Sequence, residues 1–363
     1  MGVEALEALV GTPSHWLAGV GHEADLVLST RVRLARNLTD MPFSQQADEE
    51  ALRATVSRIV SACDSSAELG GGSFLPISEL DALDREFLAE RHLISHEMLS
   101  LERPGGLYLA SGERASAMVN EEDHLRLQAV VSGLDCDGAW DRVRRAEEEL
   151  DTRLEFAFSE ELGYLTACPT NVGTGMRASV FMHLPSLVLT KKIRQVLRGV
   201  SQVGLTVRGF YGEGSEILGN FFQVSNQHTL GHSETDILAN LEKVVRQVID
   251  AEVRARGLLT RDARVQIEDK VYRAYGVLRN ARMLPSQEMI NLTSAVRFGA
   301  AIGIGLDVSL AALNELLVLT QPAHLQKMAG RLMTEDERNE YRAEVVRQRL
   351  AAHPEPGETD ASG

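Results

Sequence analysis

Alternation of polar and apolar side chains predicts a strand over residues 26–37. One face of this strand would carry Val27, Ser29, Arg31 and Arg33, and the other would carry Leu28, Thr30, Val32 and Leu34. Two arginines on one face could act together as a clamp for an anion. An edge strand whose arginines only keep it soluble would show the same pattern. The pattern alone favours this second interpretation.

Apolar positions three or four residues apart predict helices over 48–63, 78–92, 141–161 and 184–200. A capping box at Ser233 opens a further long helix, which we expect Gly257 to end. Shorter strands are predicted at 106–111, 117–120, 163–167 and 205–210, with a strand pair or hairpin within 217–225.

The character of the chain changes near residue 255. Residues 260–352 contain no convincing strand, and helices are predicted at 265–278, 288–301, 310–319 and 335–350. We therefore expect an N-terminal segment at 1–24, a catalytic domain at 25–255, a helical C-terminal domain at 256–352 and a disordered tail at 353–363.

Composition places the chain among ordinary globular proteins. It has 363 residues, 44% of them hydrophobic and 25% charged, which suits two domains. The net charge of −15 argues against a nucleic-acid partner and fits attraction of basic partners, although solubility also explains it. Three sparse cysteines, with no signal peptide and no apolar run long enough to cross a membrane, predict a reduced cytoplasmic protein.

Residues 167–179 bring a thiol, two glycines and an arginine close together. Cys168 would be a strong nucleophile or anion if its pKa were lowered. Gly173 and Gly175 would let backbone amides approach a ligand, and Arg177 could grip phosphate oxygens. A glycine-containing turn beside a buried cysteine is the alternative.

Residues 120–126 carry three consecutive carboxylates followed by an arginine. Such a run is tolerated on a solvated face or where cations bind. One interpretation is an acidic helix N-terminus, in which Arg126 would lie one turn beyond Glu122. The other is a general base flanked by cationic ligand groups. His92, at a predicted helix end, could contact a nucleotide, although an ordinary helix-end histidine is more common.

The arginines in loops or at strand ends suggest a binding scheme for a triphosphate. They are Arg31, Arg33, Arg126, Arg177 and Arg208. Neither a phosphate-binding P-loop nor the motifs of protein kinases are present, so positioning by arginines is the scheme left open. Carboxylates nearby, at positions 121, 122 and 213, could orient a guanidinium and accept its proton. These groups make sense together as an ATP:guanidino phosphotransferase.

Five motifs in order resemble those of the phosphagen kinases, which phosphorylate creatine or arginine. They are Ser-Thr-Arg-Val-Arg (29–33), Val-Asn-Glu-Glu-Asp-His-Leu-Arg (119–126), Cys-Pro-Thr-Asn-Val-Gly-Thr-Gly (168–175), Arg-Ala-Ser-Val (177–180) and Arg-Gly-x-x-Gly-Glu (208–213). Arg-His-Leu-Ile-Ser (91–95) occupies the place of the family's nucleotide-contacting histidine. The resemblance implies an α+β fold with an antiparallel sheet flanked by helices.

The resemblance also implies roles for individual residues. Glu122 would be the catalytic base beside Glu121, Glu213 the second guanidinium carboxylate, and Cys168 the reactive cysteine. Magnesium would be held by phosphates and water, with no protein ligand. ATP would be held by Ser29, Thr30, Arg31, Val32, Arg33, His92, Arg126, Arg177, Ala178, Ser179, Val180, Phe181, Arg208, Gly209, Phe210, Tyr211, Gly212 and Glu213.

Two departures from the phosphagen kinases bear on the substrate. Only 28 residues precede Ser29, so we expect the helical domain that closes over a small substrate to be missing, and a helical region of about 100 residues follows the motifs instead. This arrangement resembles the bacterial protein-arginine kinases. Their phosphoarginine-binding motif corresponds here to Arg338, Asn339, Arg342 and Ala343. Asn339 stands where the family has an acidic residue, which weakens this assignment; an ordinary charged helix is the alternative.

The sequence therefore predicts an enzyme that transfers the γ-phosphoryl group of ATP to arginine side chains of proteins. The resemblance further implies marking for a Clp-type unfoldase and protease in the stress response, a heat-shock repressor among the substrates, an activator protein as partner, and a homodimer or larger assembly. A kinase for a free guanidino compound and an inactive phosphoarginine-binding adaptor are the alternatives. The expected absence of the helical domain that closes over a small substrate argues against the small-molecule kinase. The intact motifs argue against the inactive adaptor.

Overall fold

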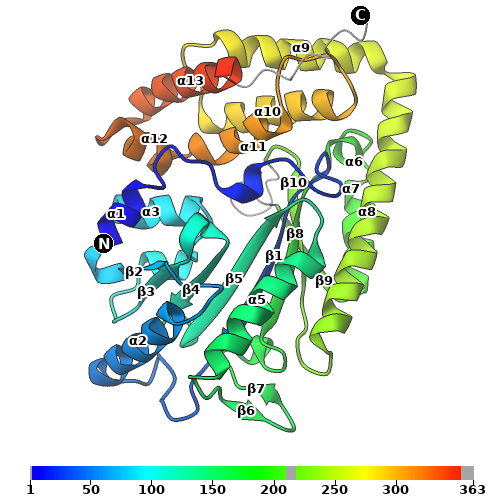
Figure 1. The fold of residues 1–363 in the computed structure, drawn as a ribbon. Coiled ribbons are helices and arrows are strands. Elements are labelled where there is room, and N and C mark those ends of the chain that lie inside the picture. Colours follow the sequence, from blue (N-terminus) through cyan, green and yellow to red (C-terminus); the bar gives the residue numbers. More distant parts are fainter. Residues whose placement is uncertain (1, 210–217, 353–363) are drawn as a thin grey trace, which may run out of the picture.

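The computed structural model describes residues 2–209 and 218–352, and an antiparallel sheet forms its centre (Figure 1). Within these residues eight strands pair in the order β2-β3-β4-β5-β1-β8-β10-β9. A separate hairpin pairs β6 (Phe158–Ser159) with β7 (Gly163–Tyr164). The bounds of the eight strands are β1 Val27–Arg36, β2 Ser73–Pro76, β3 Gly106–Leu109, β4 Ala115–Val119, β5 Leu125–Ser132, β8 Met176–His183, β9 Leu205–Gly209 and β10 Phe221–Asn226.

Strand β1 lies at the centre of the sheet, between β5 and β8. The interpretation of this strand as a solvated edge is therefore wrong. Its predicted alternation is confirmed for residues 29–34, but a bulge between Val27 and Ser29 places Val27 in the main core and Leu28 in a different core with Phe181, the reverse of the predicted faces. Val32 and Leu34 are fully buried in the main core, and Arg31 and Arg33 are half-buried on the other face. The sheet thus has one apolar face and one face that carries charge.

Helices cover the apolar face of the sheet (Figure 1). The main cover is α5 (Cys136–Asp151) and α8 (Glu234–Asp262), whose buried side chains share one core with the strands. The same core includes side chains of α2 (Glu49–Asp64), α6 (Pro185–Leu189) and α7 (Ile193–Gln202). By contrast, α1 (Gly2–Glu7), α3 (Ala82–Glu90) and α4 (His96–Leu99) form a separate core with the opposite face of β3 and β4. The α+β class expected from the sequence is confirmed.

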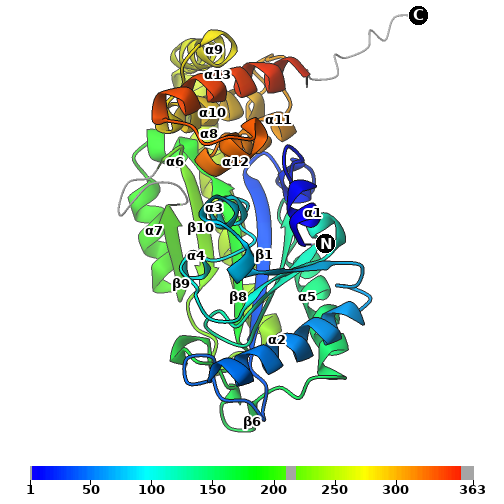
Figure 2. The ribbon, with the colours of Figure 1, turned by 90° about the vertical axis from the view of Figure 1, so that its left-hand side faces the viewer.

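The C-terminal helices stack at one end of the sheet and share a second core with it (Figure 2). They are α9 (Arg264–Asn280), α10 (Ser286–Ala301), α11 (Leu310–Leu319), α12 (Pro322–Ala329) and α13 (Glu335–Ala352). Arg297 of α10, which is fully buried, donates to the backbone oxygens of Ala24 and Asp25, each at 2.8 Å. The helical region is therefore hydrogen-bonded to the residues immediately before β1.

Two central strands were not predicted. β8 is buried on both faces for nearly all of its length, so its sequence shows no clear alternation. β5 does alternate, with Arg126, Val130 and Ser132 partly exposed between buried residues, but it was not identified from the sequence. The acidic run at 120–124 forms the turn between β4 and β5, and Arg126 lies in β5. The interpretation of this run as a helix N-terminus is therefore wrong.

Several predicted helix ends moved to positions that local capping explains. Helix α5 begins at Cys136 because Asp135 accepts a hydrogen bond from the Gly138 amide, and it ends at Asp151 rather than at 161. The helix predicted at 184–200 is divided into α6 and α7 at Lys191, whose φ is 58°. The capping box at Ser233 is confirmed, but α8 continues past Gly257 to Asp262. The expected domain boundary thus falls inside a continuous helix, and the tail at 353–363 lies outside the described residues.

Replacing Gly257 with alanine should stabilise the protein. Gly257 lies in the interior of α8, and a Cβ atom there would meet nothing within 4 Å. Because glycine is a poor helix former, Gly257→Ala should raise the free energy of unfolding by about 0.5–1 kcal/mol in urea titrations. Gly175→Ala is the control and should destabilise, since its φ is +62° and its Cβ would lie 2.6 Å from the Ala35 oxygen. A destabilised Gly257→Ala protein would contradict this account of α8.

Candidate active site

The polar face of the sheet brings the five predicted arginines to one cavity of about 1080 Å³. Arg31 and Arg33 come from the central strand, and Arg126 and Arg177 come from the first residues of its two neighbours. Arg208, in β9, lines the same cavity from farther along the sheet and is exposed. Residues almost 180 positions apart in the sequence thus form one cationic surface.

The arginines repel one another and are poorly solvated. Arg33 lies directly opposite Arg177 across the β1–β8 pair. Burial, and then the charges of Arg177 and Arg126, lower the pKa of Arg31 to about 10. Burial, and then the charge of Arg31, lower the pKa of Arg33 well below its usual value. Because the Nε atoms of Arg33 and Arg177 find no hydrogen-bond acceptor among the described residues, the cluster suits a polyanionic ligand.

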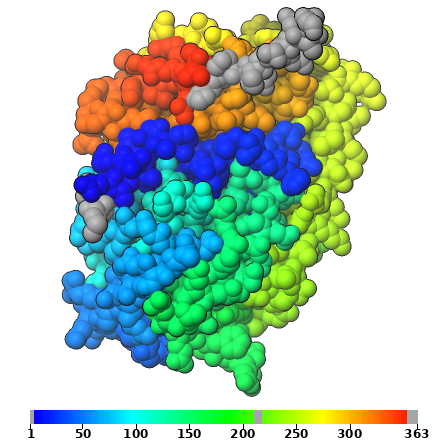
Figure 3. Space-filling view, in the orientation of Figure 1, coloured from blue at the N-terminus to red at the C-terminus, as the bar shows by residue number. Residues whose placement is uncertain are grey.

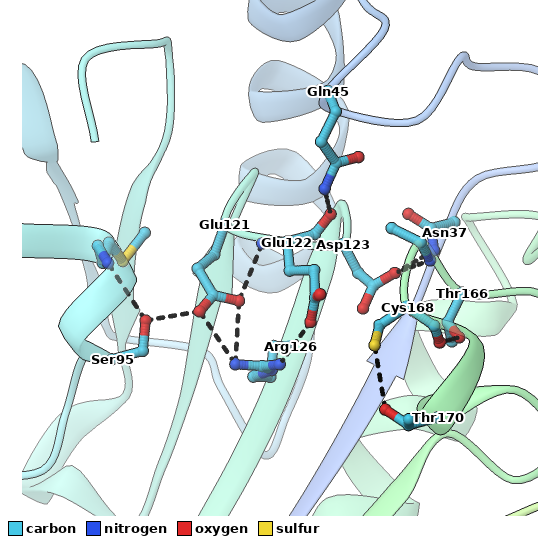
Figure 4. A network of polar contacts seen from close by, with 12 residues as sticks. Asn37, Gln45, Ser95, Glu121, Glu122, Asp123, Arg126, Thr166, Cys168 and Thr170 are labelled. Carbon is cyan, nitrogen blue, oxygen red and sulfur yellow. Dashed lines mark hydrogen bonds and ion pairs between the residues drawn. The ribbon is translucent and has the colours of Figure 1, made fainter. Parts of the chain in front are cut away.

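The turn between β4 and β5 places two carboxylates beside this cluster (Figure 4). Glu121 is buried: it accepts from the Ser95 hydroxyl at 2.5 Å and pairs with Arg126 at 3.0 Å. Glu122 is more open, with 38% of its side chain exposed, and it lies 3.4 Å from Arg126. Burial, and then the charge of Asp123, raise the pKa of Glu122. The two glutamates therefore differ: Glu121 is held in an ion pair, and Glu122 is available to a ligand.

Asp123, which the sequence reasoning assigned no role, joins this turn to the cysteine loop. Its Oδ1 accepts from the Asn37 side chain and from the Ala167 amide, both at 2.7 Å. The Asn37 Oδ1 in turn accepts from the His124 amide at 2.9 Å. In the sequence, a polar Asn37 directly after the alternating strand was the feature that could have indicated a polar contact here. These bonds fix the position of Cys168, the next residue after Ala167, relative to the glutamates.

The Cys168 thiol faces the same cavity, where it lies 3.0 Å from the Thr170 hydroxyl. Gly173 and Gly175 serve the packing of the loop. Both have positive φ, and a Cβ on either would come within 2.6 Å of a backbone oxygen, that of Thr229 for Gly173 and that of Ala35 for Gly175. The alternative of a simple turn beside a buried cysteine is wrong for the thiol, which is half-exposed.

His92 lies at the far end of the cavity, in a left-handed conformation with φ of 63°. Burial, and then the charge of Arg31, lower its pKa to about 3, so the ring is neutral at physiological pH. Trp16, from the N-terminal segment, lies 5.7 Å from the His92 ring. Sequence reasoning missed this tryptophan because nothing in its local pattern indicates a site. A small adjoining cavity is lined by Trp16 and His92 together with Ser29, Ser179, Phe181 and others.

The remaining residues predicted to bind ATP divide into three groups. Gly209 lines the main cavity. Thr30, Val32, Ala178 and Val180 are buried, and their side chains lie on the opposite face from Arg31 and Arg33. These four can reach a ligand in the cavity only through their backbone atoms. Phe210, Tyr211, Gly212 and Glu213 lie outside the described residues.

The predicted phosphoarginine motif lies in α13, far along the chain from the cavity. Arg342 is 2% exposed and donates to the backbone oxygens of Thr320 at 2.9 Å and Leu284 at 2.8 Å. It also donates to the Asn339 side chain at 2.6 Å. Ala343 is fully buried, and Arg338 donates to a backbone oxygen of the same region. Asn339 therefore takes the position of a neutral acceptor for Arg342, where an acidic residue would have formed an ion pair.

Two features are absent from the described residues. Among the residues that the structure describes, no group of three or more histidine, cysteine, aspartate or glutamate side chains is placed to hold a metal ion. None of the described helices is both long and apolar enough to cross a membrane.

Solved structures with a similar fold are phosphagen kinases. A lombricine kinase structure aligns with a TM-score of 0.57 at 24% identity, over 65% of this chain and 68% of that one. A duplicated taurocyamine kinase from Schistosoma mansoni, with bound components of a transition-state analogue, aligns with a TM-score of 0.59 at 24% identity, over 78% of this chain and 40% of that one. These likenesses define the fold class.

Sequence relatives specify the family more closely. Residues 54–255 match the model of the C-terminal catalytic domain of the ATP:guanido phosphotransferases, and residues 264–361 match that of the protein-arginine kinase McsB C-terminal domain. Protein-arginine kinases from Symbiobacterium thermophilum (48% identical) and Halothermothrix orenii (45%) each align over 93% of this chain, and over 97% and 96% of their own lengths. The chain belongs to the protein-arginine kinase family of ATP:guanido phosphotransferases.

Removing the Asp123 carboxylate should destabilise the protein, because this group connects the β4–β5 turn to the cysteine loop. Asp123→Ala leaves the Asn37 side chain and the Ala167 amide without their buried acceptor, so the free energy of unfolding should fall by about 1–3 kcal/mol. Asp40→Ala is a matched control, because Asp40 pairs with Arg58 at the surface, and that loss should cost at most about 1 kcal/mol. Equal destabilisation of the two variants in urea titrations would contradict the role given to Asp123.

Proposed function

We propose that this protein phosphorylates arginine side chains of proteins, with ATP as the donor. The observation that carries the proposal is one cavity in which a cluster of arginines meets a glutamate and a thiol. Membership of the protein-arginine kinase family supports the choice of a protein as the acceptor.

The arginines would bind and neutralise the phosphates of the nucleotide. Arg31, Arg33 and Arg177 surround the centre of the cavity, and their mutual repulsion falls when an anion binds between them. Arg126 lies between this cluster and the glutamates, bonded to Glu121 and close to Glu122. It therefore separates an anion-binding half of the cavity from a cation-binding half.

Glu122 is the group best placed to orient the acceptor guanidinium and to take its proton. It lines the cavity, it is partly exposed, and its raised pKa makes it a stronger base than an ordinary glutamate. Cys168, which lines the same cavity as Glu122, would orient the guanidinium from the other side and balance its charge, with no covalent step. Glu213 is proposed as a second carboxylate by resemblance alone.

Magnesium is part of the proposal through the nucleotide. The ion would screen the charge of the phosphates, which together with water would hold it. The groups proposed to face the phosphates are arginines rather than carboxylates, which suits an ion held by phosphates and water.

The biological setting is proposed from the resemblance to protein-arginine kinases. It comprises a cytoplasmic stress response in which phosphoarginine marks proteins for a Clp-type unfoldase. A heat-shock repressor would be a substrate, an activator protein would be a partner, and the enzyme would be a homodimer or larger assembly. Phosphoarginine would regulate it through the region around Arg342. The neutral Asn339 beside that arginine argues for weaker regulation than an acidic residue would give.

The protein should form acid-labile phosphoarginine on a basic protein and not on free arginine. The assay combines the chain with ATP, magnesium and either acceptor, and detects the product by mass spectrometry. Glu122→Gln should lower the turnover number at least about 100-fold, because the base is lost while the shape is kept. Near-normal turnover by Glu122→Gln would refute the assignment of Glu122 as the general base. Product on free arginine would favour a small-molecule kinase, and no product on either would favour an adaptor.

The pH dependence should report the raised pKa of Glu122. Only the ionised carboxylate can accept a proton, so kcat/KM should fall as the pH drops through this pKa. Because burial and Asp123 raise the value, the fall should begin at a higher pH than the pKa of an ordinary glutamate would give. The profile would be measured at saturating ATP. A rate that stays flat down to the usual glutamate range would contradict the assignment.

A further inference from the structure

The β6–β7 hairpin, residues 158–164, exposes apolar side chains that the proposed reaction leaves unused. Phe158 is 60% exposed and Leu162 is 45% exposed. Figure 3 shows that this part of the chain, coloured green, protrudes at the lower edge of the molecule. Apolar groups that stand out in this way commonly mark a surface that binds another molecule.

The hairpin is held rigidly, so its exposed groups are not simply a loose loop. The Phe158 ring packs edge-on against Tyr164 with ring centroids 5.2 Å apart. The Arg36 guanidinium lies 3.3 Å from the centroid of the Tyr164 ring, and the Tyr164 hydroxyl donates to Glu147 at 3.1 Å. Gly163 has a φ of +76°, and a Cβ there would come within 2.6 Å of the Gly173 oxygen. A preformed aromatic surface loses little conformational entropy on binding.

The hairpin is continuous with the loop that lines the active-site cavity. Tyr164 and Gly173 exchange backbone hydrogen bonds, the shorter at 2.8 Å. Between them the chain passes through Cys168, Thr170 and Asn171, all of which line the cavity on its guanidinium-binding side. A ligand that crosses from Cys168 to the hairpin would therefore follow one surface.

The charge around the hairpin selects a basic ligand. Glu155, Glu160 and Glu161 are exposed, and none forms an ion pair with any residue that the structure describes. Acidic groups beside apolar ones, next to a site for a guanidinium, complement a polypeptide with basic and apolar side chains.

We propose that the β6–β7 hairpin docks the substrate polypeptide beside its target arginine, recognising an apolar side chain flanked by basic ones. The proposal rests on the proposed function and specifies its substrate class. Tyr164 and Cys168 are four residues apart, so at most about 14 Å of extended chain joins them. An extended substrate covers that span in at most about four residues, which places the apolar side chain within about four residues of the arginine.

Two fluorescein-labelled peptides test the docking directly. Each has one arginine among glycine, serine and lysine, and they differ only in phenylalanine or serine four residues from the arginine on both sides. Binding is measured by fluorescence anisotropy without ATP. The phenylalanine peptide should bind at least about fivefold more tightly, and Phe158→Ser with Leu162→Ser should remove this preference. Val203→Ser, at an apolar position that is 48% exposed outside the hairpin, is the matched control and should keep it.

Kinetics with the same peptides provide the second measurement. The hairpin variant should raise KM for the phenylalanine peptide about fivefold, with kcat, KM for ATP and KM for the serine peptide unchanged. Charge reversal with Glu160→Lys and Glu161→Lys should weaken the binding of both peptides. Equal binding of the two peptides by the unaltered protein, or a preference that survives the hairpin variant, would overturn the proposal. Absence of phosphoarginine with intact, hairpin-dependent binding would instead refute the proposed function alone.

Discussion

Mutual repulsion among arginines at the centre of a sheet is the constraint on which this structure depends. Arg31 and Arg33 project from the central strand, and Arg33 faces Arg177 on the next strand. Within the described residues neither strand supplies a carboxylate to pair with them. The opposite face compensates, because it is mostly apolar and packs under α5 and α8, and the charge of Arg36 on that face is paired with Glu147. The fold therefore holds an anion-binding surface in place before any anion arrives, which is the preorganisation that phosphoryl transfer requires.

The sequence predicts the composition of this site better than its geometry. Alternation placed both arginines of β1 on one face, but that face could equally have belonged to an edge strand. The central position of β1 follows from its pairing with β5 and β8, and β8, which is buried on both faces, shows no period from which to find it. The pairing of Arg33 with Arg177 depends on strand register, and register depends on contacts between distant segments.

Residues that only support the site were the hardest to find. Asp123 stood in the sequence as one of three similar carboxylates, and only the fold shows that it points away from the cavity toward Asn37 and Ala167. Trp16 stood in a segment with no recognisable motif, yet it packs beside His92. Motifs identify groups that touch a ligand because the chemistry restricts the residue type. Supporting contacts satisfy only packing and hydrogen bonding, and many sequences meet those conditions.

Helix α8 belongs to both cores of the molecule. The part of α8 from Glu234 to Ala255 packs into the core under the sheet, and Leu259 packs against the core of the C-terminal helices. A helix cannot unwind at one end without disturbing the hydrogen bonds of the next turn, so the two cores share part of their stability. The sheet and the C-terminal helices should therefore melt as one cooperative unit, and partial unfolding that releases one while sparing the other would be rare.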